Sequence, residues 1–262
     1  MPRFTYCREW HPEADLEVLR LDGQGASPAE DTSIAFAPGM GSNLLSLIVG
    51  GQEYLVAGDR SSGAWQLLGT PILYPMPNRV RDGRFSFDGR DYVFLPNNGP
   101  NFIHGLVRDR AWACDAPRIG EGEISVTTRF RFAPDSPAYA LFPIRNTLEL
   151  TYTLRPGGVR LDFTVYNEDE ALRLPFGLAI HPYFAIIGNR EQVRIQSPAR
   201  YRMEAVDLLP TGRLLDVAAG PTDLRQPRPL SALALDDVFY GLSSHTPQAI
   251  YYDAIGTRLL LT

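Results

Sequence analysis

Histidines are the side chains of this sequence best suited to move a proton near neutral pH, because an imidazole has an ordinary pKa of about 6.5. His104 stands in "NFIHGLVRDRAW" and is followed by Gly105, which permits close approach of a backbone or a ligand. His181 ends the apolar run of "LPFGLAIHPYF". We interpret His11 and His245 as surface-loop residues. Acid–base chemistry at His104 and His181 is one reading, and structural, hydrogen-bonded histidines are the other.

Several other chemistries lack the residues that they need. The sequence contains no lysine, so its 25 basic residues are all arginine and no Schiff base can form. Cys7 and Cys114 are the two cysteines, too few for a disulfide framework or a cysteine zinc cluster. No nucleophile elbow, HExxH, Walker loop or complete dinucleotide fingerprint occurs. We therefore expect neither a cofactor nor a metal.

Charge and hydropathy limit the classes of partner and the cellular location that we expect. A net charge of −5 with interspersed signs gives no basic face for nucleic acid, which we exclude as a partner. No run of about 20 apolar residues indicates a membrane span, and the N-terminus is too charged for a signal peptide. We expect a cytoplasmic protein without membrane attachment, and the oligomeric state stays open.

Short strands must position the candidate residues, because the apolar residues follow a period of two. "EISVTTRFRF" (123–132) predicts a half-buried strand, and "NTLELTYTL" and "VRLDFTVYN" (146–154 and 159–167) predict a hairpin. Segments 84–87 and 90–95 predict another hairpin, with Asp88 and Gly89 in a type I′ turn.

Many short strands separated by 22 prolines and 23 glycines indicate an all-β fold, a large antiparallel β-sandwich. Segment 32–56 adds further strands, and no long amphipathic helix is evident. We expect a single domain over residues 1–262, whose first thirty residues form a loosely held flap.

Five segments in order also resemble a known family. They are "GTPILYPMPNRVRDGRFSFDG", "HGLVRDRAW", "LPFGLAIHPYF", "LLPTGRLLDV" and "LDDVF", which span 69–239. Their order and spacing resemble the aldose 1-epimerase, or galactose mutarotase, family. The resemblance implies a galactose mutarotase-like supersandwich, and a monosaccharide, specifically a hexose, as substrate.

The resemblance also assigns roles to residues. It implies that Asn78 and Arg79 line the sugar pocket and bind hydroxyls, and that His104 contacts the ring side of the sugar. It implies that His181 donates a proton to the ring oxygen, and that Asp236 grips sugar hydroxyls. The expected activity is interconversion of α and β anomers by acid–base ring opening.

One expected residue is missing from the pattern. The family's general base is a glutamate on a late strand, whereas no acidic residue follows Asp253. We expect the chain to lack the family's C-terminal strands and this base. Glu149, Glu168 and Glu204 lack motif support and are interpreted as solvated strand residues. Asp237 is the alternative to Asp236.

Other functions remain open at this stage. A binding protein of the same fold that has lost catalysis is the first. A mutarotase of hexose 6-phosphate, with Arg79, Arg108 or Arg110 binding phosphate, is the second. A lyase or glycosidase is more distant, because no pair of carboxylates stands out.

Overall fold

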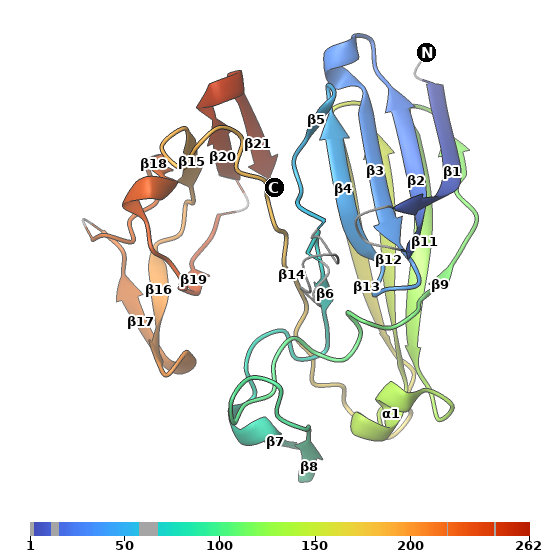
Figure 1. Ribbon diagram of the computed structural model, residues 1–262. Helices are drawn as coiled ribbons and strands as arrows, with labels where there is room; N and C mark the ends of the chain where they lie inside the picture. The colour runs from blue at the N-terminus through green and yellow to red at the C-terminus, as the bar shows by residue number, and fades with distance from the viewer. Residues whose placement is uncertain (1–2, 12–15, 58–67, 219, 244) are drawn as a thin grey trace. The chain divides into compact units, whose positions relative to one another are not determined.

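The computed structural model describes residues 3–11, 16–57, 68–218, 220–243 and 245–262 (Figure 1). These residues fall into two compact units, 1–185 and 186–262. The prediction of a single domain stays a prediction, because two compact units can belong to one domain. Each unit is described by itself below.

Two antiparallel sheets form the body of the N-terminal unit (Figure 1). The first has the order β1 (Arg3–His11), β2 (Leu16–Gln24), β3 (Thr32–Ala37), β4 (Asn43–Val49), β5 (Gln52–Glu53). The second has the order β10 (Arg118–Gly120), β11 (Glu123–Phe132), β12 (Asn146–Arg155), β13 (Gly158–Asn167), and β9 (Ala113–Cys114) also pairs with β11. The predicted all-β, antiparallel fold is confirmed.

The core lies between these two sheets. The side chains of β11 that face it alternate as predicted, and Ile124, Thr128 and Phe132 are fully buried. Across the core, the ring of Phe36 in β3 stacks on Tyr152 in β12 with a centroid distance of 4.5 Å. Two sheets that face each other across such a layer form a β-sandwich.

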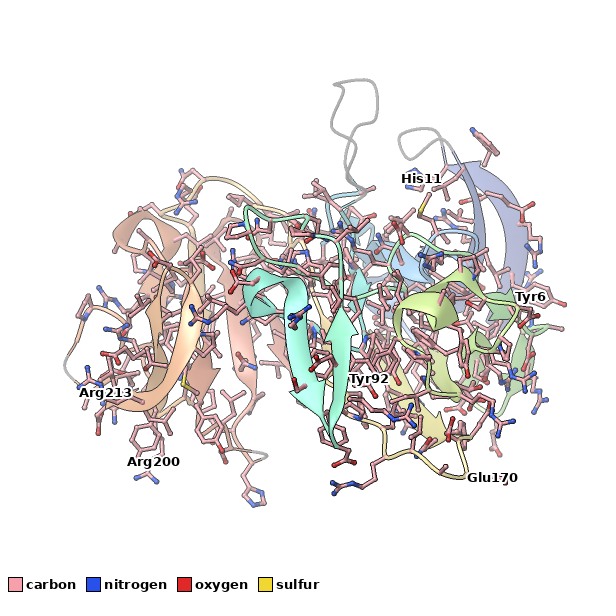
Figure 2. The ribbon with its side chains drawn as sticks, turned by 90° about the horizontal axis from the view of Figure 1, so that it is seen from below. Tyr6, His11, Tyr92, Glu170, Arg200 and Arg213 are labelled. Carbon is pink, nitrogen blue, oxygen red and sulfur yellow. The ribbon has the colours of Figure 1, made fainter. Side chains whose placement is uncertain are left out.

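Turn residues account for the hairpins. Asp88 and Gly89 have φ angles of 50° and 72°, the positive pair that a type I′ turn requires, and they join β7 (Arg84–Phe87) to β8 (Arg90–Val93). Tyr92 of β8, labelled in Figure 2, stacks on Phe85 of β7 with a centroid distance of 4.9 Å. The predicted hairpins, β7–β8 and β12–β13, are both confirmed.

The first strands differ from the prediction of a loosely held flap. β1 and β2 pair along their whole length, and β2 also pairs with β3. Val18, Leu19 and Leu21 of β2 are buried. The flap prediction was therefore wrong, because polar segments such as "GQGASPAED" flank a strand whose own apolar residues enter the core.

Shorter elements complete the N-terminal unit. β6 (Ile72–Leu73) pairs with β14 (Ala179–Ile180). The N-terminus of α1 (Pro137–Leu141) is capped by Ser136, whose side chain accepts a hydrogen bond from Ala138 N. None of the helices that the described residues form is long and apolar enough to span a membrane.

The C-terminal unit contains two further antiparallel sheets. One has the order β18 (Arg228–Pro229), β15 (Val193–Gln196), β20 (Gln248–Tyr252), β21 (Thr257–Leu261). The other has the order β17 (Leu209–Asp216), β16 (Tyr201–Val206), β19 (Phe239–Tyr240).

Candidate functional site

The short strand pair β6–β14 positions His181 at its end. Ala179 pairs with Leu73, Ile180 pairs with Ile72, and the backbone N–H of His181 donates to Pro71 O at 3.0 Å. The pairing continues beyond the strands, because Tyr183 N donates to Gly69 O at 2.7 Å. The backbone on both sides of His181 is therefore held, while its imidazole is exposed.

His104 lies in the loop between β8 and β9. Leu106 N donates to Tyr74 O at 2.7 Å, and Gly105 has a φ of 67°. A Cβ added at Gly105 would lie 2.3 Å from Tyr74 O, so only glycine fits there. His104 itself has a φ of 71°, which is uncommon for a residue other than glycine.

The two predicted histidines are brought together. Their ring centroids lie 5.5 Å apart with an interplanar angle of 60°, an edge-to-face arrangement. The ring of Tyr183 packs on that of His181, with a centroid distance of 4.9 Å. Residues 71–74 accept the backbone N–H groups of His181 and of Leu106, two positions after His104, although the two histidines are far apart in the chain. This pairing favours a shared site over two unrelated structural histidines.

The environment of His104 keeps its imidazole neutral. Its pKa falls from 6.5 to about 4, chiefly because partial burial disfavours the charged form, and then because Arg108, His181 and Arg79 are close. Nη1 of Arg108 lies 3.4 Å from Nδ1 of His104. Because the charges that act on His104 are basic groups, they oppose its protonation in the same direction as burial does.

Asn78 and Arg79 lie in the loop that follows β6. Asn78 is exposed, and its Oδ1 accepts a hydrogen bond from the backbone N–H of Arg79 at 2.8 Å. Arg79 is partly buried, and its Nε donates to Oδ1 of Asn98 at 3.0 Å. The electrostatic effect of Arg79 on His104 places this side chain in the same neighbourhood.

Asp236 belongs to the C-terminal unit, so its place beside the histidines stays a prediction. Its side chain is exposed. Asp237 differs, because its Oδ1 accepts a hydrogen bond from Nη1 of Arg202 at 3.2 Å. Of the two carboxylates, Asp236 is therefore the one that forms no hydrogen bond or ion pair with another described residue.

The three glutamates without motif support bind neighbouring side chains. Glu149 forms an ion pair with Arg129 at 2.6 Å, Glu168 accepts a hydrogen bond from Thr147, and Glu204 binds Arg213. The Arg213 guanidinium and the Thr211 hydroxyl lower the pKa of Glu204 to about 2. A carboxylate so stabilised in its charged form is a poor base, which agrees with the structural interpretation.

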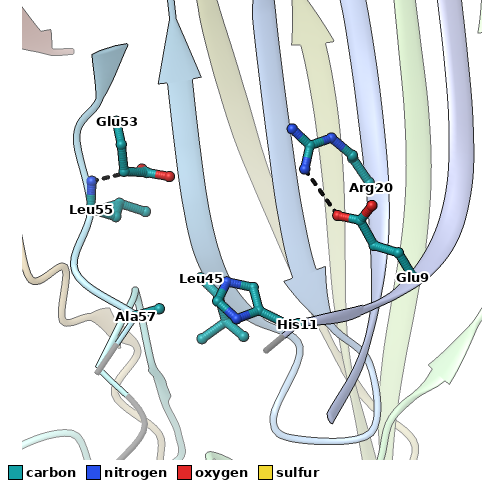
Figure 3. A pocket seen from close by; sticks show the side chains of 7 residues that line it. All are labelled: Glu9, His11, Arg20, Leu45, Glu53, Leu55 and Ala57. Atoms are coloured by element: carbon teal, nitrogen blue, oxygen red, sulfur yellow. Dashed lines mark hydrogen bonds and ion pairs between the residues drawn. The ribbon is translucent and has the colours of Figure 1, made fainter. Parts of the chain in front are cut away.

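A pocket of about 300 Å³ lies against the first sheet, and sequence reasoning did not anticipate it (Figure 3). It is lined by Glu9, His11, Arg20, Leu45, Glu53, Leu55 and Ala57. Arg20 binds Glu9 at 2.9 Å, and the Glu53 carboxylate accepts the backbone N–H of Leu47 at 2.8 Å. His11 lies in β1, so its interpretation as a loop residue was wrong.

Sequence reasoning missed Tyr183 as a neighbour of His181, and it named Arg108 only as a possible phosphate ligand, not as a contact of His104. Tyr183 follows His181 by two positions, a spacing that puts both side chains on one side of an extended segment, and this signal could have been used. The contact of Arg108 with His104 has no comparable signal, because it depends on how the loop after Gly105 turns back.

Comparisons with known proteins agree with this fold. A galactose mutarotase-like protein from Clostridium acetobutylicum has a TM-score of 0.77 at 20% identity, covering 98% of this chain and 80% of that one. Galactose 1-epimerase from Lactobacillus acidophilus has a TM-score of 0.69 at 18% identity, covering 100% of this chain and 78% of that one. The fold is therefore that of the galactose mutarotase-like proteins.

The sequence comparisons identify the family. The family model described as aldose 1-epimerase matches residues 30–261, so the chain belongs to the aldose 1-epimerase family. Galactose mutarotase from Sus scrofa is 30% identical over 156 residues, which cover 57% of this chain and 43% of that protein. The human galactose mutarotase is 28% identical over 162 residues, which cover 60% of this chain and 45% of that protein. The match thus spans less than half the length of these relatives, and the predicted family resemblance is confirmed.

Proposed function

We propose that the chain acts as a hexose mutarotase, with His181 as the acid. The observation that supports this best is the pairing of an exposed His181 with a neutral His104 at a ring distance of 5.5 Å. Family membership supports the reaction class, and the names of the relatives support galactose as the first sugar to test.

The reaction needs a proton to move at two oxygens. His181 in its imidazolium form donates a proton to the ring oxygen while the anomeric hydroxyl loses its proton to a base. The bond between C1 and the ring oxygen breaks, and an open-chain aldehyde forms. Rotation about the C1–C2 bond and reversal of the steps close the ring on either face. The two protons balance, so no net change occurs besides the anomeric configuration.

The other residues bind and orient in this proposal. His104 donates a hydrogen bond to the sugar as a neutral imidazole, and Asn78 and Arg79 bind hydroxyls beside it. Asp236 of the C-terminal unit grips further hydroxyls.

Polarimetry on freshly dissolved α-D-glucose and α-D-galactose tests the proposal. The base is unassigned, so the rate is measured with and without added formate, a small carboxylate that can remove the anomeric proton. The proposal predicts that the chain accelerates anomerisation beyond buffer, at least when formate is present. It fails if neither condition gives an acceleration that depends on His181.

A catalytically inactive sugar-binding protein gives a different result. It would bind hexose in calorimetry without accelerating anomerisation in either condition.

A mutarotase of hexose 6-phosphate is the second candidate, and the basic side chains around the histidines favour it. Arg108 and Arg79 both act on His104, and guanidinium groups bind phosphate in a bidentate manner. Arg110 is less available, because its Nε donates to Leu106 O at 2.8 Å. Competition of glucose 6-phosphate against glucose decides between the two, since a pocket for neutral sugars shows no preference for the phosphate.

A further inference from the structure

We propose that Arg108 is a positioning residue that fixes the tautomer of His104. Its guanidinium donates a hydrogen bond to Nδ1, so the ring proton resides on Nε2, and His104 presents an N–H donor to the ligand of the two-histidine site. The role toward a sugar rests on the proposed function, whereas the tautomer itself does not.

The chemistry of the two groups gives the direction of the bond. Arginine has five N–H donors and no acceptor, so Nδ1 of His104, 3.4 Å from Nη1 of Arg108, must supply the lone pair. A neutral imidazole carries one N–H, which is then on Nε2. The same contact excludes the imidazolium form, because both ring nitrogens of that form are donors.

The backbone holds Arg108 rigidly enough for this task. Gly41 N donates to Arg110 O at 2.6 Å, and Trp112 N donates to Pro38 O at 2.8 Å. Gly41 has a φ of 68°, and a Cβ there would lie 2.1 Å from the carbonyl oxygen of Arg108. The turn around Gly41 therefore clamps the 108–112 segment, and the Arg108 side chain starts from a fixed backbone.

The other charged groups that act on His104 do not replace Arg108. They are His181, whose ring lies edge-to-face against His104, and Arg79, whose Nε is bound to Asn98. Both act through space, whereas Arg108 also contacts a ring nitrogen. Arg108 thus selects the nitrogen that carries the proton, which charge alone does not do.

Nitrogen-15 NMR of the imidazoles tests the tautomer without any sugar. The chain has four histidines, and His104→Gln assigns the resonances of His104. At pH 7 we expect Nδ1 of His104 to have the shift of an unprotonated acceptor and Nε2 the shift of a protonated nitrogen. The reverse tautomer in the unaltered protein overturns the proposal.

Two variants separate the hydrogen bond from the charge. In Arg108→Met both are lost, so the tautomers mix and the pKa of His104 rises from about 4 toward its ordinary 6.5. In Arg108→Lys the charge stays, so the low pKa persists while the tautomer is less strictly selected. Arg81→Gln is the control. It removes an exposed arginine that does not contribute to the pKa shift of His104, so it leaves the spectrum unchanged. A spectrum of Arg108→Met identical to that of the unaltered protein also contradicts the proposal.

Polarimetry tests whether Arg108 also affects the proposed reaction. If the proposed function holds, Arg108→Met weakens sugar binding and lowers kcat, and Arg108→Lys recovers only part of the loss. If the NMR results appear as expected but no variant or unaltered protein accelerates anomerisation, the positioning role stands and the mutarotase proposal fails.

Discussion

Within the N-terminal unit, the two histidines of the candidate site, His104 and His181, lie in different environments. His104 is partly buried among basic groups and stays neutral at pH 7, because its pKa is about 4. A neutral imidazole of that kind is a poor proton donor to a sugar ring oxygen. The exposed His181 is therefore the residue that we propose as the donor.

Replacement of the donor tests this assignment. His181→Asn keeps a polar side chain of similar size but removes the transferable proton, so we expect the catalysed rate of anomerisation to fall by roughly 10²–10⁴-fold. Polarimetry gives the rate, and circular dichroism checks the fold. His245→Asn, the same change in the other unit, is the matched control, and an equal loss in both variants would refute the assignment.

The low pKa of His104 also makes a prediction about stability. Between pH 6.5 and 4 the unfolded chain binds a proton at this histidine and the folded protein does not, so the free energy of unfolding falls as the pH drops through that range. Urea unfolding at several pH values measures the slope. His104→Gln lacks this contribution, and its slope over the same range is shallower. Parallel slopes in the two proteins would contradict the shifted pKa.

At the scale of elements, the segment 71–74 forms backbone hydrogen bonds with the chain at His181 and just after His104. Residues 71–74 accept the backbone N–H of His181 at Pro71 and that of Leu106 at Tyr74. Tyr74 is fully buried, and its hydroxyl donates to Oδ1 of Asn146 at 2.7 Å. The spacing of the two rings therefore depends on a segment that is itself anchored in the core.

Substitution of Gly105 tests that close packing. Gly105→Ala introduces a Cβ 2.3 Å from Tyr74 O and also strains a φ of 67°. Gly89→Ala strains a φ of 72° in open space, so it measures the backbone strain alone, about 1–2 kcal/mol. We expect Gly105→Ala to lower the free energy of unfolding by more than Gly89→Ala in urea titrations. Equal losses would show that the contact with Tyr74 is unimportant.

Local sequence signals predicted the elements well and the site in part. The period of two in 123–132 and the Asp88-Gly89 turn depend on neighbours in the chain, so they could be read directly. The burial of β2 could not, because it depends on pairing with β3.

The candidate site was likewise predicted only in part. The family motifs predicted His104 and His181, and the structure brings their rings together. The contact of Arg108 with Nδ1 of His104 depends on the clamp by Gly41, which no spacing within "HGLVRDRAW" reveals. The place of Asp236 beside them stays a prediction.

At the scale of the whole molecule, the N-terminal unit is stabilised by contacts between its two sheets. The buried hydroxyl of Tyr152 in β12 donates to Ser42 O near the start of β4, and Ser42 Oγ pairs with Thr128 Oγ1 in β11 at 2.8 Å. These hydrogen bonds join the two sheets through a mainly apolar core. Buried polar groups of this kind are costly to leave unpaired.

Loss of one bridge tests its contribution. Tyr152→Phe removes the hydroxyl and leaves the buried carbonyl of Ser42 without this donor, so we expect a loss of about 1–3 kcal/mol in the free energy of unfolding. Tyr166→Phe removes an exposed hydroxyl and is the matched control, with an expected change below about 0.5 kcal/mol. Chemical denaturation of both variants measures the difference, and indistinguishable midpoints would contradict the account.

Anomerisation of freshly dissolved α-D-galactose, followed by polarimetry with and without formate, tests the central claim most directly. The account predicts that the unaltered chain accelerates the approach to equilibrium beyond buffer in at least one of these conditions, and that His181→Asn does not. Acceleration that survives His181→Asn, or none in the unaltered chain under either condition, would contradict it.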